Sequence, residues 1–248
     1  MISDPDQKAL GLRTIEGKFD REVVSIRRGD HRLDCRTCQG RRSQHFITAR
    51  AVRRLETAVY GATLRGWRGF KSDAPGDGWK ASDGELTMTG GAGDLVTVDE
   101  FGDFELNLEW KIGKGVNSGI IYRVGMSESQ TYETGPEYQL LDNPNTQESP
   151  VHFAGALYDL VPADADYTKP FGEWNKARIV VRGWKIRHWS NGTKIVDVDL
   201  ASPEGKKLVA NSKFGTMPKF ATLLRGHIAL QDHGGLVSFR GIKIRKLN

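Results

Sequence analysis

The sequence predicts an all-β fold in which two antiparallel sheets pack face to face as a sandwich. Three observations favour this class. Short runs of alternating apolar and polar residues recur along the chain, tight turns separate them, and segments with helical periodicity are few. The 248 residues include 29 glycines, which suits a fold with many turns. A series of short strands with little helix buries its apolar faces most readily as two packed sheets.

The individual strands follow from this alternation. Phe104–Lys111 alternates strictly and is therefore expected to have one buried face. Asp83-Gly84 and Asn191-Gly192 are hairpin turns, because such pairs adopt the backbone that two-residue loops need. The predicted strands are, in chain order, Trp79–Ala81, Gly84–Thr89, Phe104–Lys111, Asn117–Arg123, Thr131–Asp142, Gly155–Tyr158, Arg178–Arg182, Lys185–Trp189, Lys194–Val198, His227–Gly234 and Leu236–Ile244.

The segment Gly135–Asp142 concentrates polar side chains within one expected strand. In a regular strand Glu137 and Gln139 share a face, whereas Asp142 points the other way. A bulge between Gln139 and Asp142 would return Asp142 to the face of Glu137. An ordinary solvated strand face explains the same pattern, so both interpretations stay open. If Asn117–Arg123 pairs with this strand, Arg123 lies beside Glu137 and holds it ionised.

Two features of the second half of the chain matter later. Residues 201–224 form a long loop in which we expect a helical turn. In the last strand the apolar parity changes from Val237 and Phe239 to Ile242 and Ile244. A glycine bulge at Gly241 explains this change.

The chain divides into a basic extension, residues 1–61, and one domain, residues 62–248. Of the 36 Lys and Arg and 31 Asp and Glu, residues 1–65 hold 14 and 8, which leaves 22 and 23 for the rest. The domain is therefore close to neutral, which argues against a nucleic-acid groove. The extension is expected to be disordered, with Ile47–Tyr60 as a short amphipathic helix, or to result from a start codon placed too far upstream. A basic arm for an acidic partner is the functional alternative.

Cysteine usage and hydropathy argue against other classes of protein. Cys35 and Cys38 form a lone C-x-x-C without the second ligand pair of a zinc site or the βαβ context of a redox motif. The sequence contains no run of about 18 apolar residues, so no membrane span is predicted. The first residues lack the apolar core of a signal peptide.

Six motifs occur in an order that resembles one known family. They are Asn117-Ser118-Gly119-Ile120 with Arg123, Glu137-Tyr138-Gln139-Leu140-Leu141-Asp142, Gly155-Ala156-Leu157-Tyr158, Gly172-Glu173-Trp174-Asn175, His188 with Asn191-Gly192, and Leu230-Gln231-Asp232-His233-Gly234 with Val237-Ser238-Phe239-Arg240-Gly241-Ile242. Over roughly residues 66–247 the chain resembles the 3-keto-disaccharide hydrolase domain. The resemblance implies a concanavalin A-like jelly roll, a sugar bound on the concave face of one sheet, and action on glycosides oxidised at C3. It also implies a periplasmic or secreted bacterial protein, whereas the absent signal peptide leaves a cytoplasmic location open.

The Glu137 strand also resembles the three-acid strand of laminarinase-type glycosidases, which share this fold. Gln139 stands where those enzymes have Asp, and Asp142 where they have the second Glu. This departure disfavours retaining double displacement, which needs two carboxyl groups about 5–5.5 Å apart. A ketone at C3 acidifies the C2 hydrogen, so removal of that proton, elimination at C1 and hydration form the expected route. A lyase that performs the elimination alone is the narrower version.

The expected roles follow from this route. Glu137 is the general base, or His233 if the substrate lies reversed, and the other of the two protonates the leaving oxygen. Arg123 stabilises the enolate. Gln139, Asp142, Tyr158, Gln231 and Arg240 are expected to bind the sugar. The structural alternatives are that His233 caps a turn and that Arg240 pairs with an acid on a neighbouring strand; His188 is expected at the surface.

No cofactor is firmly predicted. Asp142-Asn143 and Asp232-His233 offer the oxygen ligands that calcium prefers, but their spacing is not that of a calcium loop, so no metal site is assigned. The expected partner is a sugar, and the sequence does not define the oligomeric state. A carbohydrate-binding module without catalysis is the competing function, because it needs hydrogen bonds and stacking but no perturbed acid or base.

Overall fold

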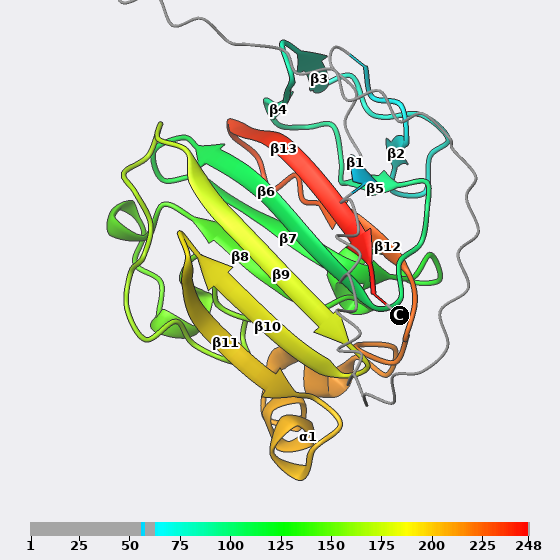
Figure 1. Ribbon diagram of the computed structural model, residues 1–248, viewed down its shortest axis with the longest axis vertical. Helices are drawn as coiled ribbons and strands as arrows, with labels where there is room; N and C mark the ends of the chain where they lie inside the picture. The colour runs from blue at the N-terminus through cyan, green and yellow to red at the C-terminus, as the bar shows by residue number, and fades with distance from the viewer. Residues whose placement is uncertain (1–55, 58–62, 248) are drawn as a thin grey trace, which may run out of the picture. The chain divides into compact units, whose positions relative to one another are not determined.

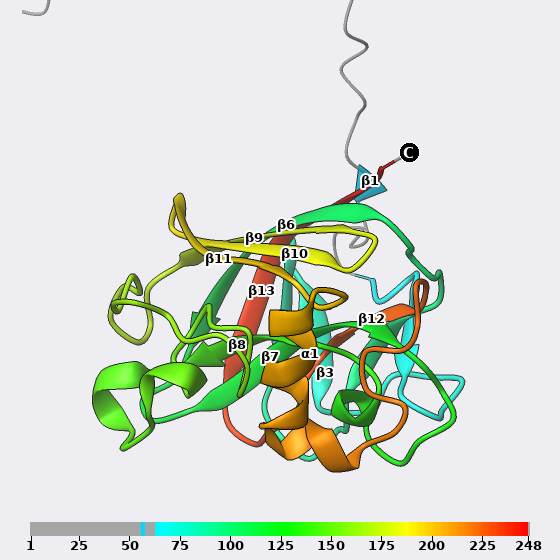
Figure 2. The same ribbon diagram turned by 90° about the horizontal axis from the view of Figure 1, so that it is seen from below.

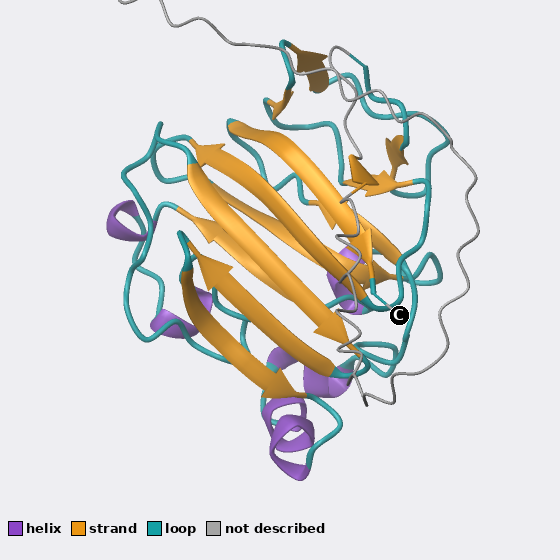
Figure 3. Cartoon of the chain, in the orientation of Figure 1, coloured by secondary structure: helices purple, strands orange, loops and turns teal. Residues whose placement is uncertain are grey.

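The computed structural model describes residues 56–57 and 63–247 of the chain. Nearly all regular structure in these residues is β-strand, and two antiparallel sheets form stacked layers (Figures 1 and 2). The predicted two-sheet jelly-roll sandwich is therefore confirmed. Colouring by secondary structure shows that the helical segments are short and lie outside the sheets (Figure 3).

The larger sheet has eight strands among the described residues, in the order β11-β10-β9-β6-β13-β4-β3, with β1 paired to β13. Their bounds are β1 Glu56–Thr57, β3 Trp79–Ser82, β4 Glu85–Met88, β6 Phe104–Ile112, β9 Asn175–Arg182, β10 Lys185–Ser190, β11 Thr193–Asp199 and β13 Val237–Lys246. Both expected hairpins, β3–β4 and β10–β11, are present.

The smaller sheet has the order β2-β5-β12-β7-β8. Its strands are β2 Trp67–Gly69, β5 Leu95–Thr97, β7 Asn117–Val124, β8 Glu137–Leu141 and β12 His227–Leu230. The helical segments are the α-helix α1 Pro203–Ala210 and the 3-10 turns η1 Thr131–Glu133, η2 Asn143–Asn145, η3 Pro150–His152 and η4 Lys213–Thr216. The expected helical turn in the 201–224 loop is thus α1, followed by η4.

Of the expected extension, Glu56 and Thr57 form β1, which pairs with β13 at the end of the domain. The remainder of residues 1–61, including Cys35, Cys38 and most of the Ile47–Tyr60 segment, lies outside the described residues.

The alternation of strand residues builds the core between the two sheets. On β6, Phe104, Leu106 and Trp110 are almost fully buried, and they meet Tyr122 of β7 and Tyr138 of β8. Each sheet therefore directs one set of side chains inward and the alternate set away from its partner sheet.

The predicted glycine bulge in the last strand is confirmed. Gly241 has φ +60°, and the pairing of β13 with β6 shifts between Arg240 and Lys243. The extra residue restores inward-facing apolar side chains on both sides of the bulge, Phe239 before it and Ile242 and Ile244 after it.

One alternative that the sequence left open is excluded, and one local expectation is wrong. β7 and β8 do pair as predicted, but their register runs without a shift from Asn117–Leu141 to Ile121–Glu137, so no bulge redirects Asp142. Gly155–Tyr158 is not a regular strand. This segment bonds to the edge of β8 through Gln139 and Glu137, but positive φ at Gly155 interrupts the extended backbone.

His188 is fully buried rather than exposed at the surface, because its strand parity directs it into the core. The hydroxyl of Tyr122 lies 2.9 Å from its Nε2, and the carbonyl oxygen of Gly155 lies 3.0 Å from its Nδ1. A carbonyl oxygen can only accept, so Nδ1 carries the proton and Nε2 accepts from Tyr122. His188 therefore links both sheets and one loop as a neutral ring, and burial lowers its pKa to about 4.

This burial predicts an acid-sensitive fold. The unfolded chain binds a proton at His188 below about pH 6.5, whereas the folded protein does so only near pH 4, so stability falls as pH drops through this window. The contribution that is lost approaches about 3 kcal/mol at pH 4. Chemical denaturation of wild type and His188→Gln between pH 4 and 7 should show a smaller pH dependence in the variant. His233→Gln, which changes an exposed histidine, should retain the wild-type slope.

Candidate active site

A pocket of about 180 Å³ lies on the face of the smaller sheet that points away from the larger sheet. Tyr138 and Leu140 of β8 enter the core, so the alternate residues Glu137 and Gln139 face the pocket. Loops from distant parts of the chain complete its walls. The lining residues are Asn117, Tyr132, Glu137, Gln139, Tyr158, Lys213, Gln231 and His233.

Glu137 lies in this pocket because the neighbouring strand carries a glycine. Gly119 of β7 pairs with Gln139, next to the Glu137–Ile121 pair. A Cβ atom at position 119 would lie 2.0 Å from Oε1 of Glu137 and 2.7 Å from its Cδ. The missing side chain of Gly119 therefore provides the space that the Glu137 carboxyl occupies.

The environment of Glu137 changes its acidity. Glu137 is 4% exposed, and burial raises the pKa of its carboxyl to about 8. Of the nearby charges, the Lys213 ammonium lowers this pKa and the Asp94 carboxylate raises it. A carboxyl group with a pKa close to neutrality can accept and return a proton under physiological conditions. Strong perturbation within a pocket is a frequent property of catalytic acids and bases.

Lys213 is the cation of the pocket. It begins η4, and its backbone N–H donates to Oδ2 of Asp159 at 2.8 Å. Although the residue is solvent-exposed, its ammonium lies 4.3 Å from the ring centroid of Tyr158 and 5.0 Å from that of Tyr132. Partial burial lowers the pKa of Lys213, whereas Glu137 and Asp159 raise it. These contacts hold a positive charge close to Glu137.

Amide side chains line the floor of the pocket. Nε2 of Gln139 donates to Oδ1 of Asn117 at 3.0 Å. Oε1 of Gln139 is buried and accepts no hydrogen bond from any described residue. A buried unpaired oxygen is a natural acceptor for a ligand hydroxyl. Gln231 is 8% exposed and adds a third amide beside β7.

The loop that carries His233 is fixed by an acidic neighbour. Asp232 accepts hydrogen bonds from the backbone N–H groups of Ala92 at 2.6 Å and Gly93 at 2.9 Å. Its own N–H donates to Oδ1 of Asp94 at 2.9 Å. His233 itself is exposed at the rim of the pocket. The rim position of His233 therefore depends on backbone contacts to a separate loop.

Tyr158 forms a wall of the pocket and is supported from behind. His152 stacks on it with ring centroids 4.5 Å apart. His152 in turn lies 2.7 Å from Glu148 and 3.3 Å from Asp159. Burial and the nearby Glu137 raise the pKa of the Tyr158 hydroxyl, so it remains a neutral donor.

The structure brings together five of the residues singled out from the sequence: Glu137, Gln139, Tyr158, Gln231 and His233. Arg123 is not among them. It has φ +56°, and the opposite strand β12 shifts register at His227, so Arg123 leaves the alternation that would place it beside Glu137. Its guanidinium instead donates to the carbonyl oxygens of Gly102 and Gly183 and to Asp103. Arg123 therefore ties loops together.

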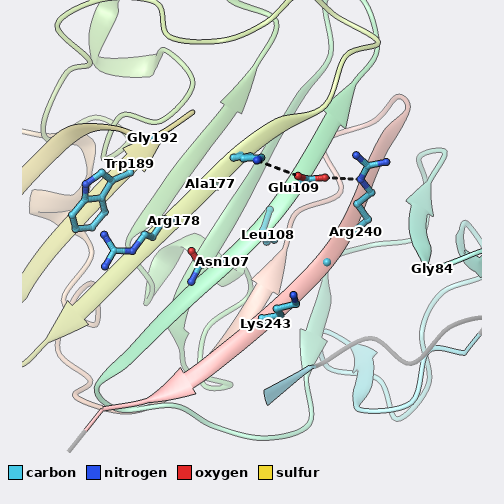
Figure 4. Close-up of a pocket in the computed structure, with 12 residues that line it drawn as sticks. Gly84, Asn107, Leu108, Glu109, Ala177, Arg178, Trp189, Gly192, Arg240 and Lys243 are labelled. Atoms are coloured by element: carbon cyan, nitrogen blue, oxygen red, sulfur yellow. Dashed lines mark hydrogen bonds and ion pairs between the residues drawn. The ribbon is translucent and has the colours of Figure 1, made fainter. Parts of the chain in front are cut away.

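Asp142 and Arg240 also lie elsewhere. Oδ2 of Asp142 accepts from the N–H of Gly115 at 2.7 Å, which fixes the turn before β7. Arg240 stands on the larger sheet, where its Nε donates to Glu109 at 2.6 Å (Figure 4). Arg240 was grouped with the Glu137 site by motif order, which does not specify the sheet. Asp142 would have needed a bulge that the β7–β8 register does not contain.

Three lining residues were not recognised from the sequence: Lys213, Tyr132 and Asn117. Lys213 is one of several lysines in the 201–224 loop, and no local pattern distinguishes it from Lys219. Asn117 belongs to a motif that was recognised. Strand alternation places Asn117 on the same face of β7 as Gly119 and Ile121, and this alternation could have identified it as a pocket residue. Tyr132 lies in a 3-10 turn and has no periodic signal.

In the part of the chain that the structure describes, no three His, Cys, Asp or Glu side chains are grouped so that they could hold a metal ion. No described helix is long and apolar enough to cross a membrane.

Comparison with known proteins gives a consistent set of relatives. The model of the 3-keto-alpha-glucoside-1,2-lyase-like domain matches residues 56–245. A 3-keto-disaccharide hydrolase of Bacteroides thetaiotaomicron is 34% identical over 226 residues, which cover 77% of this chain and 78% of that protein.

Two crystal structures of proteins from Parabacteroides distasonis, described as candidate glycosyl hydrolases, are similar to this chain. The first has a TM-score of 0.72 at 30% identity and covers 76% of this chain and 91% of its own. The second has a TM-score of 0.61 at 29% identity, with coverages of 73% and 99%.

The raised pKa of Glu137 predicts that this site destabilises the protein at alkaline pH. The unfolded carboxyl ionises near pH 4.5 and the folded one near pH 8, so the folded state keeps a proton that the unfolded state has lost. Stability contributed by this group is complete below pH 4.5 and falls by up to about 5 kcal/mol as pH rises to 8. Glu137→Gln should therefore raise the melting temperature at pH 8 more than at pH 5. The surface variant Glu85→Gln should show no such difference.

The contact at Gly119 predicts a steric effect on the site. Gly119→Ala should displace the Glu137 carboxyl and lower turnover at least tenfold, because the new methyl group and Oε1 cannot share the space. Gly102→Ala is the matched control, since the added Cβ would meet no atom closer than 3.5 Å. Equal turnover in the two variants would contradict the proposed role of Gly119.

Proposed function

Because the chain belongs to the 3-keto-alpha-glucoside-1,2-lyase-like family, we propose that it cleaves glycosides whose glucose ring is oxidised at C3, using the Glu137 pocket. The observation that carries this proposal is a buried carboxyl with a pKa of about 8 beside a lysine ammonium in a polar pocket. A module that only binds sugar has no need to keep a destabilising carboxyl in this environment. The Bacteroides relative, named as a 3-keto-disaccharide hydrolase, supports the choice of substrate.

The proposed reaction begins at C2 of the oxidised ring. The Glu137 carboxylate removes the C2 proton, and the electrons of the C–H bond form an enolate with the C3 carbonyl. The enolate then re-forms the ketone, a C1=C2 double bond appears, and the C1–O bond breaks with its electrons on the leaving oxygen. That oxygen takes up a proton. Addition of water, OH at C1 and H at C2, completes a net hydrolysis.

Each step has a candidate group in the pocket. Glu137 is the base, and Lys213 takes the enolate-stabilising role first expected of Arg123, because its ammonium is the cation that faces Glu137. His233 at the rim is the donor to the leaving oxygen. Gln139, Gln231 and Asn117 bind ring hydroxyls, with the unpaired Oε1 of Gln139 as acceptor.

The pocket dimensions support attack on a terminal sugar. Its volume of about 180 Å³ is smaller than the roughly 300–1,000 Å³ of pockets that enclose drug-sized ligands. One oxidised ring therefore occupies the pocket, and the leaving group extends past His233 into solvent. This orientation is the one in which Glu137 acts as base and His233 as acid.

The reaction route is tested by incubating the protein with a 3-keto-disaccharide in heavy water and following the products by NMR. Glucose release with deuterium at C2 of the 3-keto-glucose is the expected result, because water supplies the new C2 hydrogen. Accumulation of the unsaturated sugar without hydration would restrict the activity to that of a lyase. Saturable sugar binding with no release would overturn the enzyme and favour a carbohydrate-binding module.

The residue roles are tested by paired variants. Glu137→Gln should abolish C2 exchange, and Lys213→Met should lower kcat at least a hundredfold with little change in melting temperature, because one oxyanion-stabilising group contributes about that much. Lys219→Met, a second exposed lysine of the same loop, is the control and should retain activity. Wild-type turnover should rise with pH towards about 8, as the Glu137 carboxyl ionises. Full activity of Lys213→Met would show that this lysine does not stabilise the enolate.

A further inference from the structure

The larger sheet carries a second hollow that the proposed reaction does not use. It measures about 790 Å³ and lies on the outer face of β6, β9 and β13, so both sheets separate it from the Glu137 pocket (Figure 4). Its volume lies within the range of sites that enclose organic ligands. Glu109, Arg178 and Arg240 contribute side chains to it, and Asn107 lies near its centre.

The strand register arranges these side chains in rows across three strands. Lys176, Glu109 and Arg240 are paired neighbours, so a carboxylate stands between two cations in that row. One row further along β6, Arg178, Asn107 and Lys243 are paired in the same way. Here the central position is an amide, so the two flanking cations face no carboxylate within their row.

The glycine bulge creates this second row. The two rows contain the pairs Arg240–Glu109 and Lys243–Asn107. From one pair to the next, β13 advances by three residues and β6 by two. Without the extra residue, Arg240 and Lys243 would point to opposite faces of the sheet. The bulge at Gly241 therefore places both cations on the outer face, as bulges beside functional sites often do.

Both arginines are held in place before any ligand arrives. Nε of Arg178 donates to Glu105 at 2.8 Å, and its guanidinium lies 4.1 Å from the ring centroid of Trp189. Arg240 repeats this arrangement with Glu109 at 2.6 Å and Trp174 at 4.1 Å. Each guanidinium binds its carboxylate through Nε, so its terminal nitrogens remain available to an oxyanion. Because the side chain is already held in place, binding costs little conformational entropy.

Charge identifies the class of occupant. The hollow is lined by the cations Lys176, Arg178, Arg240 and Lys243 and by the carboxylate of Glu109. Beside the lining, the Glu105 carboxylate accepts from Arg178, Asn107 and Arg245, so cations still outnumber carboxylates on this face. The ligand that complements this face is anionic.

We infer that the outer face of the larger sheet binds an acidic oligosaccharide, with a carboxylate or sulfate group of the sugar on the Arg178–Asn107–Lys243 row. Asn107 and the fixed guanidinium donate hydrogen bonds to the oxyanion, and Lys243 supplies a second positive charge. The volume accommodates several polar rings, more than an inorganic ion needs. This site is independent of the Glu137 pocket and does not require the proposed reaction.

The site is tested by calorimetric titration of the full chain with tetragalacturonate, with a sulfated tetrasaccharide and with neutral maltotetraose. Saturable binding of an acidic sugar, weakened by salt, and none of the neutral one is the expected result. Lys243→Glu should weaken this binding at least tenfold. Lys80→Glu makes the same charge change on the exposed β3 edge and should alter it less than twofold. Comparing the two acidic sugars distinguishes a carboxylate ligand from a sulfate ligand.

Several outcomes would overturn the inference. The first is that neither acidic sugar binds at low salt. The second is that Lys243→Glu and Lys80→Glu weaken binding equally. The third is that Glu137→Gln abolishes binding, which would show that the ligand binds in the Glu137 pocket. Equally tight, Lys243-dependent binding of a single-stranded oligonucleotide with the same number of charges would mark a general polyanion surface instead.

Discussion

The hydrogen bonds of His188 connect the parts of the molecule that must be aligned. Its ring joins Tyr122 of the smaller sheet to β10 of the larger one. Its Nδ1–H donates a hydrogen bond to the carbonyl oxygen of Gly155. The N–H of Gly155 donates to Gln139 at 2.8 Å, so the same loop is bound to the strand that carries Glu137. A polar bridge inside an apolar core tolerates little displacement, because any broken hydrogen bond leaves a buried group unpaired. This bridge therefore aligns the two sheets with the wall of the Glu137 pocket.

The pocket depends on a second constraint, the close approach of Glu137 to the backbone at Gly119. A carboxyl group buried over a glycine lowers stability at neutral pH, and the same burial gives it the pKa of about 8 that the proposed base requires. Stability and the proposed function thus oppose each other at one side chain. Lys213 reduces this conflict by placing a positive charge nearby, and Tyr158 limits where that charge can lie.

The two outer faces of the sandwich are proposed to have different roles, and they are built differently. Loops cover the outer face of β7 and β8, so Glu137 and Gln139 are buried on a face that an isolated sheet would expose to water. The hollow on the outer face of β6, β9 and β13 is lined mainly by residues of these strands, and its charges are arranged by strand register and by one bulge. A small pocket with a buried carboxyl suits the proposed proton transfer, whereas an open row of cations suits the proposed reversible binding.

The sequence by itself determined the sandwich, both hairpins and the Gly241 bulge, because strand alternation and turn chemistry are local properties. It also determined the grouping of Glu137 with Gln139, which share a strand face, and its motif order indicated Tyr158, Gln231 and His233. It did not determine that Arg123 turns away, since a positive φ and a register shift on the neighbouring strand redirect this residue. Nor did it identify Lys213, place Arg240 on the opposite sheet or show that His188 is buried. Those positions depend on contacts between residues far apart in the chain, and the tertiary structure alone decides them.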